Sequence, residues 1–230
     1  MMQPTAVSNY IRERILQRRG RMRIFTELDA SRMALVIVDM QNVFCQPGAA
    51  LEIAPSRDTA DNINRLAVAC REQDIPVIWI RSYHPPGGAD WRMFFDHFVT
   101  PERSEWAAQQ LEESNPGSQI YDAMQVEELD FIVNKIRYSA MIPGSSNLER
   151  LVRSLGKDTL IVCGTRSNVC CESTARDAMM LDFKVLFVSD GTSAMSDQEH
   201  QATLDILAQS FADVVTTDEV LKDIHGDHAN

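Results

Sequence analysis

The chain has 230 residues, of which 44% are hydrophobic and 24% charged, with a formal net charge of −11 at pH 7. This length and composition are typical of one globular α/β domain with a sizeable core. The negative charge argues against nucleic acid as a partner, because that binding requires a basic surface that displaces counterions from phosphates. No window approaches the ~18 consecutive apolar residues of a transmembrane helix, so we expect no membrane partner.

The N-terminal region has the opposite charge to the rest of the chain. Residues 10–23 contain six arginines and one glutamate, a local charge of +5. A targeting peptide or a membrane-surface helix is one interpretation, but the segment lacks the apolar stretch and cleavage pattern of a secretory signal. We therefore predict that residues 1–30 form a basic N-terminal arm, which packs on the acidic body of its own chain or on a neighbouring subunit.

The cysteine content indicates a reducing compartment. The chain has five cysteines, an odd number, and they lack the paired spacing of metal ligands. Without a signal peptide, this usage predicts a cytoplasmic protein. Cys70 and Cys163 lie within apolar patterns and are expected in the core, where a thiol behaves as a small hydrophobic group.

Short apolar runs rich in β-branched residues recur along the chain, as expected of strands buried on both faces. They occupy residues 33–38, 75–80, 131–133, 159–163 and 185–188, with a last short strand at 214–215. Helical patterns separate or follow them at residues 58–73, 147–154, 172–181, 198–211 and 219–224. This alternation predicts an α/β fold for a single domain spanning residues 1–230. We expect three layers, doubly wound, with helices flanking a mostly parallel central sheet of about six strands.

One long segment shows no clear periodicity. Residues 82–117 contain four prolines, three glycines and six aromatic side chains. Irregular segments of this length inside a compact domain are usually functional, and this one follows a strand. We expect it to lie over the carboxyl edge of the sheet, where open α/β folds bind ligands. Its aromatic residues form either an apolar lid or the inward face of a helix.

Cys170 lies between the strand at 159–163 and the helix at 172–181. The free N–H groups and the macrodipole at a helix N-terminus favour negative charge, so we expect the thiol pKa to be lowered. The same N–H groups can stabilise the oxyanion that forms when a thiolate attacks a carbonyl. The position therefore favours a nucleophile.

Two further residues occupy equivalent positions. Asp39 directly follows the first strand, and Lys135 follows the third. In a parallel sheet both would meet Cys170 at one edge, where the carboxylate acts as general base and the ammonium holds the charges in place. Each residue alone also has a structural explanation: a cap for Asp39, a solvated charge for Lys135 and core packing for Cys170.

Three segments resemble the blocks of a known family. They are DMQNVF at 39–44, KIRYS at 135–139 and GTRSNVCCESTARDA at 164–178. They resemble the isochorismatase-like cysteine hydrolases, in the same order, over about residues 33–217. The resemblance implies a parallel sheet flanked by helices and a triad that cleaves amide or ureido C–N bonds through a thioester, without a cofactor. It implies Asp39 as base, Lys135 as electrostatic partner and Cys170 as nucleophile.

The same resemblance implies a cis peptide bond between Thr165 and Arg166, with the backbone N–H groups of Arg166 and Cys170 as the oxyanion hole. The third block is most similar to that of the ureidoacrylate amidohydrolases, although Arg166 and Cys171 depart from it. The implied substrate is a small carboxamide, ureido or carbamoyl compound, and the implied assembly is a homodimer or homotetramer.

Four further side chains are candidate substrate-binding residues: Gln41, Ser82, His84 and Tyr138. Nicotinamidases of the family bind a metal through an Asp-Trp-His-Pro-x-x-His pattern, of which residues 82–88 keep one histidine. A single histidine does not hold zinc, so we predict no catalytic metal. His84 either lines the pocket or caps a loop, and Tyr138 is either a substrate contact or a structural residue.

Two other functions compete with hydrolysis. A binding or assembly protein of the same fold is one alternative; family members of that kind often lack part of the triad, whereas this chain has all three positions filled. A redox sensor would use Cys170 and Cys171, but adjacent cysteines seldom form an unstrained disulfide. An amidohydrolase therefore remains the leading interpretation, with the binding protein as its alternative.

Overall fold

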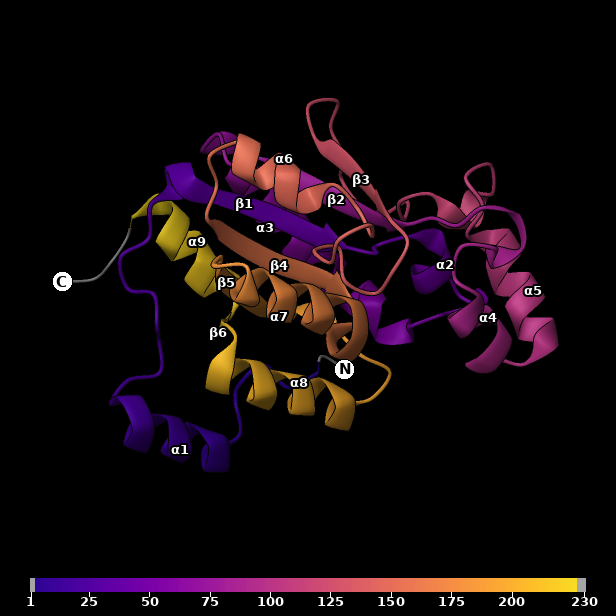
Figure 1. Cartoon of the computed structure of the whole chain (residues 1–230). Coiled ribbons are helices and arrows are strands. Elements are labelled where there is room, and N and C mark those ends of the chain that lie inside the picture. Colours follow the sequence, from indigo (N-terminus) through magenta and orange to yellow (C-terminus); the bar gives the residue numbers. More distant parts are fainter. Residues whose placement is uncertain (1–2, 227–230) are drawn as a thin grey trace.

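The computed structural model of the chain describes residues 3–226. Six parallel strands form one sheet in the order β3-β2-β1-β4-β5-β6 (Figure 1). The strands are β1 (Met33–Val38), β2 (Val77–Ser82), β3 (Phe131–Lys135), β4 (Thr159–Thr165), β5 (Lys184–Ser193) and β6 (Asp213–Val215). The predicted fold class is confirmed, and every predicted strand is present within a few residues of its expected bounds.

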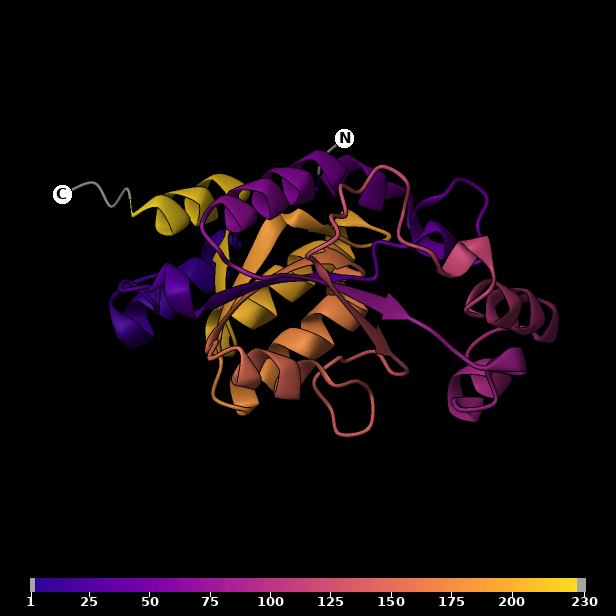
Figure 2. The ribbon, with the colours of Figure 1, turned by 90° about the horizontal axis from the view of Figure 1, so that it is seen from above.

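Helices cover both faces of the sheet, which is the middle layer of three (Figure 2). One face carries α6 (Leu148–Ser154), α7 (Glu172–Met180) and α8 (Asp197–Ser210), and the other carries α3 (Ala60–Glu72) and α9 (Thr217–His225). Side chains of β1 alternate between the layers, because successive residues of a strand point to opposite faces. Val36 packs with the first group of helices and Ile37 with the second. No helix within residues 3–226 is long and apolar enough to span a bilayer.

The chain reverses its direction of winding between β1 and β4. From β1 it proceeds outward to β2 and β3, then returns to place β4 on the other side of β1. Ligands of open α/β folds bind at such a switch point, outside the carboxyl ends of the strands. Asp39 follows β1 and Cys170 follows β4, so the two residues flank this position.

A glycine permits close contact between the two strands at this point. Gly164 of β4 pairs with Val38 of β1 and has a φ of +109°. A Cβ atom at this position would lie 2.1 Å from the Val38 carbonyl oxygen. Only glycine adopts this backbone conformation without a clash, and it does so where both strands approach the candidate site.

The segment 82–117 is more regular than its sequence pattern predicts. It contains two short helices, α4 (Arg92–His97) and α5 (Pro101–Gln110), which lie beyond the carboxyl ends of the strands (Figure 1). Thr100 caps α5 and Pro101 begins it, a combination that favours helix initiation. The helices pack on α2 (Asn42–Cys45) through an apolar cluster of their own. Two helices this short leave too few turns for a recognisable period.

The N-terminal arm packs on its own chain. Its helix α1 (Asn9–Arg19) places Ile11 and Ile15 against Ala208 of α8. Arg18 and Arg19 donate hydrogen bonds to carbonyl groups in the last turn of α8, which has no basic residue of its own there. Positive charge at a helix C-terminus is favourable, which explains the attachment.

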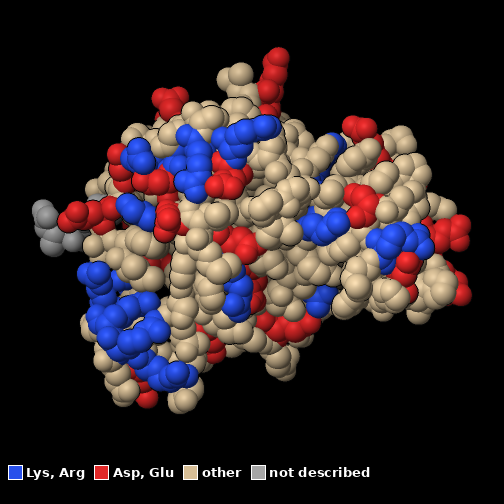
Figure 3. Space-filling model, viewed as in Figure 1, with Lys and Arg blue, Asp and Glu red and all other residues tan. Residues whose placement is uncertain are grey.

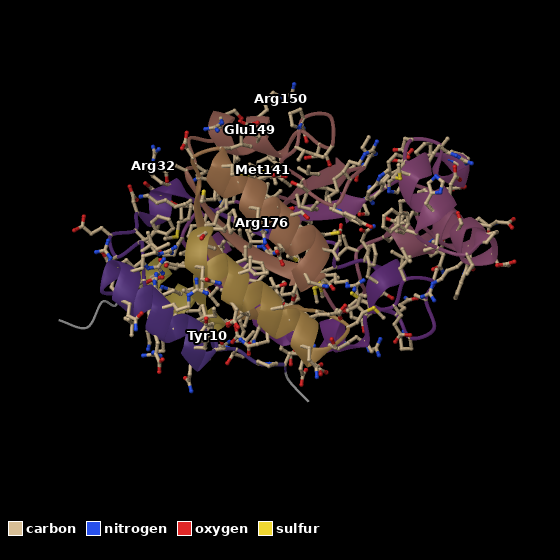
Figure 4. The ribbon with its side chains drawn as sticks, turned by 60° about the horizontal axis from the view of Figure 1, so that its bottom comes forward. Tyr10, Arg32, Met141, Glu149, Arg150 and Arg176 are labelled. Atoms are coloured by element: carbon tan, nitrogen blue, oxygen red, sulfur yellow. The ribbon has the colours of Figure 1, made fainter. Side chains whose placement is uncertain are left out.

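The outer surface of α1 remains basic. Lys and Arg side chains gather over it in Figure 3, in contrast to the mixed charges elsewhere on that face. Tyr10 also lies on this outer side (Figure 4), exposed and with the Arg14 guanidinium 5.6 Å from its ring centroid. The arm therefore adds a positive surface to an acidic protein.

We predict that Arg23 anchors the end of the arm. Its guanidinium lies 2.7 Å from Asp223 and 3.5 Å from Asp213, both largely buried. Arg23→Gln should lower the free energy of unfolding by about 1–3 kcal/mol, since buried carboxylates lose their cation. Urea denaturation measures this, with Arg21→Gln, an exposed neighbour, as a control expected within about 0.5 kcal/mol of wild type. Equal effects of the two substitutions would contradict the prediction.

A buried histidine on α8 supports the turn that carries Cys170. His200 is fully buried, and its Nδ1 lies 2.7 Å from Oγ of Ser167. Burial lowers the pKa of His200, although nearby backbone carbonyls oppose this. The imidazole is therefore neutral in the folded protein at pH 7.

The lowered pKa predicts a loss of stability in acid. The unfolded chain binds a proton at His200 near pH 6.5, and the folded chain binds it only at lower pH. The contribution of His200 to the free energy of unfolding is therefore fully present above about pH 6.5 and is lost as the pH falls below it. The contribution approaches about 1.4 kcal/mol per pH unit in this window. His200→Gln should be less stable at pH 7.5 yet lose less on acidification to pH 5.5, measured by urea denaturation. The exposed His97→Gln should retain the wild-type slope, and an unchanged slope in His200→Gln would refute this.

Candidate active site

The structure brings Asp39, Lys135 and Cys170 together. The Lys135 ammonium lies 2.8 Å from Oδ2 of Asp39 and 3.5 Å from Sγ of Cys170. It also donates to Oγ of Ser82 at 2.9 Å and to the carbonyl oxygen of Arg137 at 3.0 Å. Lys135 and Asp39 are each 1% exposed and Cys170 is 8% exposed. The site is therefore a buried ion pair in contact with a thiol.

The strand ends position these groups. Asp39 follows β1 with a φ of 52°, a left-handed conformation in which Asp is enriched among non-glycine residues, and its N–H donates to Ile80. Ser82 ends β2, the strand between β1 and β3, and its Oγ donates to Oδ1 of Asp39 at 3.1 Å. Lys135 ends β3. Three adjacent strands thus end in an acid, a hydroxyl and an amine that contact one another.

Lys135 remains charged despite its burial. Burial alone lowers the pKa of Lys135, but the interactions with Asp39 and Cys170 outweigh this effect and the pKa is raised. Hydrogen bonds to the same two groups act in the same direction. An ammonium at this position stabilises negative charge on either neighbour.

The expected lowering of the Cys170 pKa is wrong for the substrate-free site. Burial, and then the charge of Asp39, raise the pKa of Cys170 to about 12, while Lys135 lowers it only in part. Cys170 lies in a single π-helical turn (Ser167–Cys171) before α7. The helix dipole favours a thiolate there, but burial disfavours the charged form and has the larger effect on the pKa. Cys170 is therefore a thiol in the substrate-free protein.

The contacts of Lys135 allow a proton to move between Cys170 and Asp39 inside the site. The Cys170 sulfur and the Asp39 carboxylate share one proton and one negative charge. When Asp39 takes the proton, the carboxylate charge that raises the thiol pKa is lost. Lys135 contacts both groups, so the ammonium compensates the charge in either location. A buried acid, amine and thiol in this geometry are suited to general base and nucleophilic catalysis.

The backbone before Cys170 has the expected conformation. The peptide bond between Thr165 and Arg166 is cis, as the family resemblance implies. The Arg166 side chain points to Glu199, with which it forms an ion pair at 2.8 Å. Cys171 is fully buried, and its Sγ contacts the Cys163 carbonyl. The assignment of the Arg166 and Cys170 N–H groups as an oxyanion hole stays a prediction.

A cavity of about 450 Å³ opens onto Cys170 and Asp39. Among the predicted substrate-binding residues, Ser82, His84 and Tyr138 line it. Gln41 is not among its lining residues: the side-chain amide donates to the carbonyls of Ser82 and Ser118 and accepts from the Ser82 N–H. Gln41 therefore fixes the end of β2.

His84 is a buried neutral group beside the cavity. Its Nδ1 lies 2.8 Å from Asp90, and its ring stacks on Trp91 with 5.8 Å between centroids. Burial lowers the pKa of His84, and the hydrogen bond to Asp90 opposes this. Within residues 3–226 no three His, Cys, Asp or Glu side chains are grouped as metal ligands.

Aromatic and aliphatic side chains form most of the remaining wall. Trp91 contacts the ring of Tyr138 edge-on at 4.7 Å, and burial raises the pKa of the Tyr138 hydroxyl. The sequence places Trp91 and Phe94 near the site, but it does not single out the other lining residues, which come from several segments of the chain: Phe44 of α2, Leu51, Ile53, Leu111 and Met195. Such residues are recognised only once the chain is folded.

Comparisons with known proteins agree with the fold and with the motifs. Residues 33–219 match the isochorismatase domain family. The ureidoacrylate amidohydrolase RutB of Pseudomonas savastanoi pv. phaseolicola is 30% identical over 200 residues, which cover 81% of this chain and 81% of that protein. A probable inactive nicotinamidase of Arabidopsis thaliana is 28% identical over 173 residues, 74% of this chain and 85% of its own length.

A solved structure extends the match to three dimensions. A cysteine hydrolase from Pseudomonas syringae pv. phaseolicola superposes with a TM-score of 0.78 and 31% identity, covering 87% of this chain and 96% of that one. The family match includes Asp39, Lys135 and Cys170, and it spans all six strands. On the combined evidence of sequence, site geometry and fold, the chain belongs to the isochorismatase domain family.

Proposed function

We propose that the protein is a cysteine-dependent amidohydrolase that cleaves a C–N bond of a carboxamide, ureido or carbamoyl compound through a thioester. The observation that carries the proposal is the Lys135 ammonium, which contacts both the Asp39 carboxylate and the Cys170 thiol at the end of a cavity. Amidohydrolases of non-peptide C–N bonds are among its relatives, which supports a hydrolase of this class.

The first half-reaction forms the thioester. Asp39 removes the thiol proton as Sγ of Cys170 attacks the substrate carbonyl carbon, and the carbonyl oxygen becomes an oxyanion. The N–H groups of Arg166 and Cys170 are the proposed donors to that oxygen. The C–N bond then breaks, and the nitrogen leaves as ammonia or an amine with the proton held by Asp39.

The second half-reaction uses the same groups. Asp39, again a carboxylate, removes a proton from water as the water oxygen attacks the thioester carbonyl. The C–S bond breaks, Cys170 recovers the proton, and the product leaves as a carboxylic or carbamic acid. Lys135 keeps its proton throughout and compensates the negative charge as it moves between carboxylate and sulfur.

Replacing the nucleophile tests the proposal directly. Cys170→Ala should lower kcat by about 10³-fold or more, because the variant lacks the sulfur that forms the covalent intermediate. Ammonia release from a panel of carboxamides, ureido acids and carbamoyl amino acids is the measurement. The control is Cys171→Ala, which removes the adjacent buried thiol and should retain turnover.

The outcomes separate the two candidate roles. Activity retained in Cys170→Ala would eliminate the triad. No release from any compound by folded wild-type protein would favour the alternative of a binding or assembly protein. The assay of the wild-type protein is necessary because one of the relatives is described as a probable inactive nicotinamidase.

Asp39→Asn should change turnover and thiol reactivity in opposite directions. Loss of the general base should lower kcat by about 10²–10⁴-fold. Loss of the carboxylate charge, which raises the Cys170 pKa, should instead increase the thiolate fraction and accelerate alkylation by iodoacetamide at pH 8 by at least about tenfold. Mass spectrometry of the folded proteins measures the rate at Cys170, and alkylation that is unchanged or slower in the variant would contradict the proposed coupling.

A further inference from the structure

We infer that the substrate is an amide with a long apolar acyl group, an alkyl or arylalkyl chain, and a small amine as leaving group. The inference rests on the proposed function and narrows its substrate class. It depends on four features of the cavity: its division into a polar end and an apolar body, its size, the arrangement of its charges and its exposed apolar rim.

The cavity has two chemically different parts. Polar groups are gathered near the nucleophile, where Asp39, Ser82 and His84 lie with Cys170. Most of the other lining residues are aromatic or aliphatic, such as Phe44, Leu51, Phe94 and Leu111. A ligand that complements this wall is polar at the reacting end and apolar along the rest of its length.

The volume exceeds what a small amide requires. About 450 Å³ lies within the ~300–1,000 Å³ range of pockets that bury drug-sized ligands. A carboxamide carrying only a few carbon atoms would leave most of the apolar wall in contact with water. Each methylene group that fills this space contributes favourably to binding.

The mechanism determines which half of the substrate is large. The leaving nitrogen takes its proton from Asp39, which is 1% exposed and enclosed by Ser82 and Lys135. A small amine suits this enclosed end of the site better than a bulky one. The acyl group stays attached to Sγ of Cys170 and extends into the apolar body of the cavity.

The charged lining residues do not form a carboxylate site near the thiol. Arg166 is neutralised by Glu199 at 2.8 Å, and Glu52 pairs with Arg57 at 2.8 Å. Arg103 lines the cavity as an exposed side chain, and its Nε donates to the Ala50 carbonyl. Within the described part of the chain, a substrate carboxylate beside the apolar wall would have no dedicated buried cation, and burial without one is unfavourable.

Apolar side chains at the rim of the cavity are exposed. Phe98 is 69% exposed and Met195 is 57% exposed, and both line the cavity. They come from different parts of the chain, the end of α4 and the segment after β5. A long acyl chain would cover both, so its end would contact apolar surface that water now covers.

The test is a homologous series of primary amides from propanamide to octanamide, with 3-phenylpropanamide. Each is paired with a chain of equal length that ends in a carboxylate. We expect kcat/KM for ammonia release to rise roughly threefold to fourfold for each added methylene until the cavity is filled. The carboxylate-terminated partners should be at least about tenfold poorer substrates than their apolar counterparts.

Matched variants connect the effect to the cavity. Phe98→Ala should lower kcat/KM for octanamide by about threefold to tenfold and leave propanamide unchanged. Trp106→Ala removes an exposed aromatic residue of α5 that does not line the cavity, and it should change neither substrate. Equal effects of Phe98→Ala on short and long amides would contradict the inference.

Failure of the inference is distinguishable from failure of the proposed function. A flat or falling dependence on chain length, with hydrolysis abolished by Cys170→Ala, would overturn the apolar substrate and keep the amidohydrolase. A preference for carboxylate-terminated amides that is lost in Arg103→Gln would overturn it in favour of an acid site at the rim. If no amide is hydrolysed, binding of the same series to Cys170→Ala is measured by calorimetry. Affinity that rises with chain length supports the apolar cavity, and affinity that is independent of chain length refutes the inference.

Discussion

The buried ion pair between Lys135 and Asp39 is the interaction on which the site depends. Two opposite charges that are each 1% exposed persist only when their polar atoms are satisfied, and Lys135 has four acceptors: the Asp39 carboxylate, the Ser82 hydroxyl, the Arg137 carbonyl and the Cys170 sulfur. These acceptors come from the ends of different strands or from the segments that follow them. The pair therefore fixes the carboxyl edge of the sheet as well as the charge beside the nucleophile.

The electrostatics of the site differ from those of a free helix N-terminus. Burial and the neighbouring carboxylate keep the thiol protonated, so the proposed reaction depends on a proton transfer between Cys170 and Asp39 rather than on a standing thiolate. A buried thiol is less prone to oxidation than an exposed thiolate, because oxidation follows thiolate character and exposure. The same burial argues against a redox function for Cys170 and Cys171, which lie in the structure as free thiols.

The sequence predicts the sheet, most of the helices and the three triad positions, because each depends on a local pattern: an apolar run, a helical period, or a reactive residue directly after a strand. It does not reveal α4 and α5, which are short helices separated by a break before Pro101. It also misplaces Gln41, whose amide holds Ser82 instead of lining the cavity, and it misjudges the Cys170 pKa. These features depend on burial and on contacts between distant segments, such as Leu51 and Met195 on one wall.

The close contact between β1 and β4 makes the site sensitive to a change of one carbon atom. Asp39 directly follows Val38, the residue that Gly164 contacts, and Cys170 lies one helical turn beyond the end of β4. A methyl group at position 164 would meet the Val38 carbonyl at 2.1 Å, so the strands would have to separate. Proton transfer requires base and thiol to stay within hydrogen-bonding reach. Gly164 should therefore tolerate substitution poorly, although it does not line the cavity and takes no part in the proposed chemistry. The spacing of Asp39 and the Cys170 sulfur depends on the absence of a side chain at this position.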